Sequence, residues 1–228
     1  MESEEILSKL ASMGDPKAVE GMIKFGINTK NAYGVSIPNI RALARKIGKD
    51  HSLAQRLWSS GIHEARILAG IVEDPKLVTE EQMERWAKDF DSWDVCDQCC
   101  SNLFDRTNFA HKKAIEWSTR KEEFVRRAGF TLMATLAVHD KKAGNEDFIV
   151  FLPFIKNAAT DERNFVKKAV NWALRQIGKR NARLNKKALE LAKEIQEIDS
   201  RSAKWISSDA IKELTSKTVQ ERLKRKSR

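Results

Sequence analysis

The chain has 228 residues, of which 41% are hydrophobic and 32% are charged, which is typical of a folded protein with a sizeable core and one domain or one continuous repeat array. No stretch approaches the about 18 apolar residues of a membrane span, and the acidic, amphipathic start is unlike a secretory leader, so we expect a cytoplasmic protein with no membrane partner. The formal net charge of +10 favours a polyanionic partner, and nucleic acid is the simplest one.

The pattern along the chain is helical almost throughout. There are only four prolines and ten glycines, and apolar residues recur three and four positions apart. Breaks are expected near residues 14–16, 28–38, 48–51, 74–75, 105–108, 140–145 and 198–202. Helices of roughly 10 to 18 residues between short breaks predict an all-α stack of antiparallel helices.

A first basic cluster follows a helix start expected near Pro38. It contains Arg41 and Arg45, with Lys46 and Lys49 close behind. Clustered cations indicate a binding surface more strongly than a diffuse excess of charge does. We therefore expect Arg41 and Arg45 to contact the polyanion.

The segment FDSWDVCDQCC, which starts at Phe90, combines an aromatic residue with acidic ones. Trp93 and Asp97 stand four positions apart, so they lie on one face of any helix that includes both. Asp94 is expected at the N-terminal end of that helix. The spacing alone equally allows Trp93 to be a core anchor and Asp97 to pair with a nearby cation.

All three cysteines, Cys96, Cys99 and Cys100, also lie in this segment. They cannot tie distant parts of the chain together, and we expect reduced thiols in the core. A structural zinc site needs four ligands, and the four histidines are scattered. We expect no metal, and the chain has no nucleotide-binding fingerprint that would imply another cofactor.

The chain contains an internal repeat. EFVRRAGFTLMATLAVHDK from Glu123 matches NFVKKAVNWALRQIGKRN from Asn164 at an offset of 41 residues, and weaker echoes start at Ile62, Ser92 and Ser200. This offset is typical of HEAT and armadillo units, which are helix pairs that stack into a solenoid with a concave binding face. Chance similarity in a basic helical chain is the alternative interpretation.

The second copy lies in a strongly basic stretch. Residues 163–189 include nine Lys or Arg residues and no acidic residue. A helical wheel of this copy gives a core stripe of Val166, Ala169, Val170, Ala173 and Ile177.

The same wheel leaves Lys168 and Arg175 on the opposite side, with Trp172 one turn from each. Burial of Trp172 against a neighbouring helix is the alternative. In the first copy the wheel buries Val125, Gly129, Leu132 and Leu136, and it turns Arg127 outward, at the repeat position of Lys168. The residues expected to contact the polyanion are Arg41, Arg45, Arg126, Lys167, Lys168, Arg175 and Lys179.

The chain ends in the basic run RLKRKSR, which starts at Arg222. Terminal basic runs are usually flexible and bind polyanions without selectivity. We therefore expect one repeat domain over residues 1–214 and a flexible tail over residues 215–228.

These motifs resemble the AlkD-type DNA alkylation repair family, which has an all-α, HEAT-like repeat fold. SWDVCD carries a Trp and an Asp in the family's spacing, FVRRAGF carries its Arg, and FVKKAVNWALR carries its second Trp. GVSIPNIRALA is similar to the family's second-helix region, and the resemblance extends along nearly the whole chain. The cysteine-rich CDQCC departs from the expected pattern.

The resemblance implies a monofunctional DNA glycosylase that excises cationic N3- and N7-alkylpurines from double-stranded DNA without obligatory base flipping. Nothing in the sequence suggests more than a monomer. It implies that Trp93, Asp97, Arg127 and Trp172 contact the lesion-bearing nucleotide. Asp97 would stabilise positive charge on the sugar, the two Trp rings would hold the sugar and backbone, and Arg127 would grip a phosphate. The protein would then be associated with the nucleoid when bound.

Two alternatives stay open. Some branches of the family keep the fold without excision activity, so the chain is alternatively a non-catalytic binder of branched or distorted DNA. It is alternatively a HEAT-type scaffold whose polyanion is an acidic protein surface.

Overall fold

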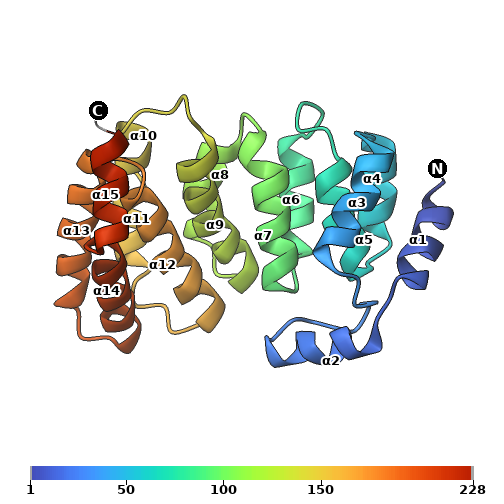
Figure 1. Cartoon of the computed structure of the whole chain (residues 1–228), viewed down its shortest axis with the longest axis horizontal. Coiled ribbons are helices and arrows are strands. Elements are labelled where there is room, and N and C mark those ends of the chain that lie inside the picture. Colours follow the sequence, from blue (N-terminus) through green and yellow to red (C-terminus); the bar gives the residue numbers. More distant parts are fainter. Residues whose placement is uncertain (1, 227–228) are drawn as a thin grey trace. The chain divides into compact units, whose positions relative to one another are not determined.

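The computed structural model describes residues 2–226, and within this range it contains helices and no strand, as Figure 1 shows. The all-α expectation is confirmed. The chain divides into two compact units, the first ending at Thr107 and the second beginning at Asn108. None of the helices in the described part of the chain is long and apolar enough to cross a membrane.

Unit 1 is built around α5, which packs against α3, α4 and α7. Its elements are α1 (Ser3–Ser12), α2 (Pro16–Lys24), α3 (Ile37–Ile47), α4 (His51–Ser59), α5 (His63–Val72), α6 (Glu80–Lys88), α7 (Trp93–Asn102) and the 3-10 helix η1 (Phe104–Arg106).

Aromatic side chains form the core of unit 1. The rings of Trp58 and Trp86 are stacked with their centroids 4.0 Å apart, and Phe90 and Phe104 pack around them. A buried carboxylate, Glu73, accepts hydrogen bonds from His51, Gln55 and Gln82 and so connects the end of α5 to α4 and α6. These partners satisfy a charge that would otherwise be costly to bury.

Unit 2 consists of stacked helices in which α12 lies between α9 and α14, α8 packs on α9, and α13 packs on α12 and α14 (Figure 1). Its helices are α8 (Ala110–Ser118), α9 (Glu123–His139), α10 (Glu146–Ile149), α11 (Leu152–Asn157), α12 (Asn164–Gly178), α13 (Ala182–Gln196), α14 (Arg201–Leu214) and α15 (Lys217–Lys226).

The helix boundaries follow the repeat and the breaks. The two matching copies are α9 and α12, which begin at Glu123 and Asn164. The weaker echoes begin at Ile62, Ser92 and Ser200, which are the N-cap residues of α5, α7 and α14. Every expected break coincides with a boundary between two helices. The sequence did not mark the breaks after α4, α6, α8, α11 and α12. In the break after α4, Gly61 has a φ of 69° that only glycine adopts easily.

The C-terminal segment is helical where we expected a flexible tail. Helix α15 runs over Lys217–Lys226 and buries Val219 and Leu223, which stand four positions apart. The amide of Gln220 donates to the Leu214 carbonyl at 2.6 Å and fixes the turn before α15. The last two residues of the basic run lie outside the described residues. The single-domain boundary at residue 214 stays a prediction.

Candidate nucleic-acid interface

Helix α7 brings Trp93 and Asp97 onto one face. Trp93 is its first residue, and Asp97 follows one turn later. The opposite face, which includes all three cysteines, is buried, whereas Trp93 and Asp97 are half-buried. The expected juxtaposition is therefore confirmed within unit 1, and both side chains keep some exposure to solvent.

A backbone carbonyl orients the Trp93 ring. The indole Nε1 of Trp93 donates to the carbonyl oxygen of Phe25, the residue that follows α2, at 3.0 Å. The side chain of Phe25 itself is 70% exposed, and that of Ile23 is 59% exposed. No sequence signal marks this contact, because any residue at position 25 supplies the same carbonyl.

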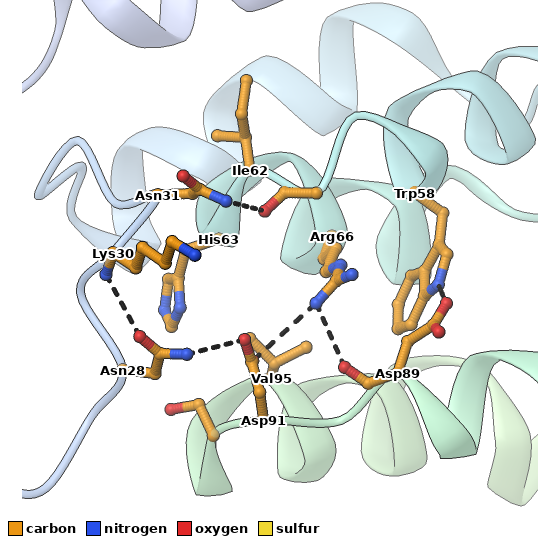
Figure 2. Close-up of polar contacts among 12 residues, drawn as sticks. Asn28, Lys30, Asn31, Trp58, Ile62, His63, Arg66, Asp89, Asp91 and Val95 are labelled. Carbon is orange, nitrogen blue, oxygen red and sulfur yellow. Dashed lines mark hydrogen bonds and ion pairs between the residues drawn. The ribbon is translucent and has the colours of Figure 1, made fainter.

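Polar contacts fix the segment that precedes α7, as Figure 2 shows. The amide of Asn28 donates to Asp91 at 2.8 Å, and Arg66 on α5 lies 3.7 Å from the same carboxylate. Arg66 also donates to the Asp89 carbonyl, and Trp58 donates to the Asp89 side chain. These contacts hold the start of α7 against α5 and against the segment after α2.

Asp94 has a structural role. One carboxylate oxygen accepts from the Ser92 hydroxyl at 2.6 Å and from the Val95 backbone N–H at 3.0 Å, and the other lies 2.9 Å from His63 Nε2. Burial alone lowers the pKa of His63, but the hydrogen bond and charge of Asp94 outweigh it and the net pKa is raised. Burial alone raises the pKa of Asp94, but the contact with His63 and the other donors lower it overall.

This pair predicts a pH-dependent stability. The contribution of His63 is complete below its unfolded pKa of about 6.5 and is lost as the pH rises through its higher folded value. The contribution of Asp94 is complete above 3.8 and is lost as the pH falls through its lower folded value. We expect the Tm to fall as the pH rises above 6.5, by about 2–4 °C for each 1 kcal/mol lost.

Thermal unfolding of His63→Gln and Asp94→Asn checks this expectation. In each variant, the decrease in Tm with rising pH should be smaller by the amount that the His63–Asp94 pair contributes. The variant with both substitutions should show the same decrease as either single variant, because the two groups act together. A decrease in Tm that is unchanged in both variants would assign the pH dependence to other groups.

The cysteines do not form a reactive or metal-binding cluster in the described residues. Cys96, Cys99 and Cys100 are buried and unpaired as disulfides. Burial raises the pKa of both Cys99 and Cys100 well above the usual value, so their thiols stay protonated. Among residues 2–226 no group of three or more ligand-type side chains is arranged to hold a metal ion.

In unit 2, the wheel of α12 is confirmed. The five residues expected in its core stripe are all fully buried, Lys168 is exposed, and Trp172 is half-buried. Within the described range, Lys168 takes part in no ion pair. Lys168 and Trp172 are one turn apart, so α12 presents a cation and an aromatic ring side by side.

The expectation that Arg127 points outward is wrong. Arg127 is only 5% exposed, and its Nη1 donates to the Phe165 carbonyl in the first turn of α12 at 2.6 Å. A wheel drawn for α9 alone assigned that side to solvent, whereas α12 packs against it. Arg127 thus connects α9 to the helix that carries Trp172.

Acidic residues from a neighbouring helix partly neutralise the basic stretch. Arg175 contacts Asp209 at 3.2 Å and Glu213 at 2.6 Å, and Lys179 contacts Glu213 at 2.6 Å. Both acidic residues lie on α14, outside the stretch that has no acidic residue of its own. Arg175 and Lys179 are therefore paired with acidic side chains, whereas the sequence predicted that they would be unpaired.

The other expected contact residues differ in exposure. Arg126 lies 3.5 Å from Asp161, and the Lys167 ammonium lies 5.3 Å from the centre of the Trp205 ring. Arg41 and Arg45 are exposed on α3 in unit 1. The exposed cations of the predicted set are thus Arg41, Arg45 and Lys168.

The chain matches a known protein family along most of its length. The model of the DNA alkylation repair enzyme family matches residues 6–214. The chain belongs to this family. An uncharacterised protein of Listeria innocua is 21% identical over 199 residues, which are 86% of this chain and 87% of that protein.

A solved structure shares the fold of this family member. It comes from a family of proteins related to the HEAT-like repeat DNA glycosylases with affinity for branched DNA structures. It superposes with a TM-score of 0.79 at 21% identity and covers 98% of this chain and 96% of that one. The HEAT-like repeat fold expected from the 41-residue offset is confirmed.

Proposed function

We propose that the protein is a DNA glycosylase that excises positively charged N3- and N7-alkylpurines from duplex DNA. The observation that carries this proposal is the pairing of Trp93 and Asp97 on one half-buried face of α7, in a chain of the DNA alkylation repair enzyme family. No cofactor is needed for this chemistry, and the protein would act as a monomer.

The residue types suit the reaction. An alkylated purine carries a cationic ring, so the departing base is a good leaving group and needs little help from a general acid. As the glycosidic bond breaks, positive charge develops on the deoxyribose. The carboxylate of Asp97 would stabilise that charge and position a water at the anomeric carbon. The base need not be flipped into a pocket for this step, unlike in most glycosylases.

The aromatic residues would hold the nucleotide. The Trp93 ring, oriented by the Phe25 carbonyl, would pack on the sugar and backbone. On α12, the half-buried Trp172 would offer DNA a second aromatic ring. The buried Arg127 would not bind a phosphate. It would instead position α12, because it donates to the Phe165 carbonyl in the first turn of that helix. Arg41, Arg45 and Lys168, which are exposed, would contact phosphates.

A second candidate is binding of branched or distorted DNA without excision. It is favoured by the solved structure with the same fold, whose family has affinity for branched DNA structures. Such binding would use the same cations and would fall steeply with salt, because phosphate contacts release counterions.

A base-release assay distinguishes the two candidates. We expect the purified chain to release 7-methylguanine or 3-methyladenine from methylated duplex DNA faster than the spontaneous rate. The same preparation is tested for binding to a four-way junction and to the matching duplex. Release at only the spontaneous rate, with tighter binding to the junction, would reject the glycosylase and support the second candidate.

A further inference from the structure

Unit 2 contains a basic hollow that the proposed excision site does not use. Its volume is about 250 Å³, far more than the about 10–15 Å³ that one water needs. Its lining residues are Ala137, Val138, Lys141, Gln176, Lys179, Arg180, Asn181 and Arg222. Four of these eight side chains are cationic, and they come from three places in the fold: the segment after α9, the end of α12, and α15.

Helix α15 completes this basic hollow. Its buried residues Val219 and Leu223 hold one face of the helix against the rest of unit 2. Arg222 lines the hollow beside them. Within residues 2–226, Arg222 forms no ion pair, whereas its neighbour Glu221 lies within 4.0 Å of Lys217 and 3.9 Å of Arg225. The guanidinium of Arg222 therefore keeps its donors for a ligand.

The other three lining cations are held in place by contacts within the protein. Lys179 contacts Glu213, which is shared with Arg175. Arg180 donates to the carbonyls of Ala137 and Ala143 at 3.1 and 2.8 Å and stacks 4.3 Å from the Phe148 ring. Lys141 donates to the Val138 carbonyl.

The local charge balance favours an anion. Burial lowers the pKa of Arg180, because it takes the guanidinium out of water, and the charges of Asp140 and Asp147 only partly oppose this. Of the acidic side chains that act on the lining cations, Glu213 contacts Lys179 directly. An anionic ligand would offset the remaining positive excess.

We propose that the basic hollow binds a phosphate group, with Arg222 as its bidentate donor and Gln176 as a neutral one. Gln176 lies one turn beyond Trp172 on α12, so a DNA backbone phosphate in the hollow would lie along the same helix as the proposed nucleotide contact. If the phosphate belongs to DNA, this proposal rests on the proposed function. If the phosphate is a free ion, it does not.

Two variants on α15 test the proposal with the full chain. Arg222→Gln removes the donor in the hollow, and Arg225→Gln removes an equal charge from the same helix without touching the hollow. The first probe is inorganic pyrophosphate, with binding measured by calorimetry. We expect wild type and Arg225→Gln to bind alike and Arg222→Gln to bind about 10-fold more weakly. Circular dichroism checks that α15 is kept.

The second probe is duplex DNA over a range of salt concentrations. If the phosphate comes from DNA, Arg222→Gln alone should weaken binding about 3- to 10-fold and reduce the salt slope by about 1. Loss of pyrophosphate binding with unchanged DNA binding would assign the hollow to a free phosphate. If neither probe distinguishes Arg222→Gln from Arg225→Gln, the hollow is not a phosphate site. If wild type binds no DNA, the proposed function fails, and pyrophosphate alone decides the hollow.

Discussion

Replacing Asp97 with Asn is expected to slow release of 7-methylguanine from methylated duplex DNA by about 10²- to 10³-fold. The amide keeps the shape of the carboxylate but cannot offset the positive charge that develops on the sugar. DNA binding should be unchanged or slightly tighter, because one negative charge is removed next to a polyanion. Single-turnover release, measured with enzyme in excess, isolates the chemical step.

Asp91→Asn is the matched control for this variant. Asp91 lies two residues before α7, is exposed, and contacts Asn28 and Arg66, so its loss changes the local charge by the same amount. We expect its release rate to stay within about threefold of wild type, because the asparagine oxygen can still accept from the Asn28 amide and hold the start of α7, and because exposed charges are screened. Equal rates for Asp97→Asn and wild type would show that Asp97 does not stabilise the transition state, even if base release itself is observed.

The sequence predicted the helix series well and the surfaces between helices poorly. The repeat located the starts of α9 and α12, because each copy encodes its own core stripe. The helical wheel misplaced Arg127, because a wheel describes one helix and not the neighbouring helix that covers it. The sequence also predicted that Arg175 and Lys179 would be unpaired cations. Their acidic partners, Asp209 and Glu213, each follow 34 residues later in the chain.

The sequence predicted the candidate site only where its residues are close together along the chain. The four-residue spacing of Trp93 and Asp97 was enough to place them on one helix face. The Phe25 carbonyl that orients Trp93 leaves no mark in the residue types. Arg222 was assigned to a non-selective tail, because its basic neighbours concealed the spacing of Val219 and Leu223 that docks α15.

Gly129 on α9 is expected to be among the positions least tolerant of substitution. A Cβ added there would lie 2.4 Å from the Ser118 backbone nitrogen and 2.8 Å from the Trp117 carbonyl carbon, which belong to the end of α8. The obstructing atoms are backbone, so no side chain can turn away, and α8 and α9 would have to separate. We expect Gly129→Ala to destabilise the protein by about 3 kcal/mol.

Denaturant unfolding of Gly129→Ala beside Gly21→Ala measures this effect. Gly21 also lies inside a helix, α2, but a Cβ there meets nothing within 4 Å, so alanine should stabilise by about 0.5–1 kcal/mol through helix propensity. The two variants add the same methyl group, and only the packing differs. Because α9 also carries Arg127, separation of α8 from α9 should disturb its bond to the Phe165 carbonyl and with it the start of α12. Equal stability of the two variants would mean that α8 and α9 approach less closely than these distances imply.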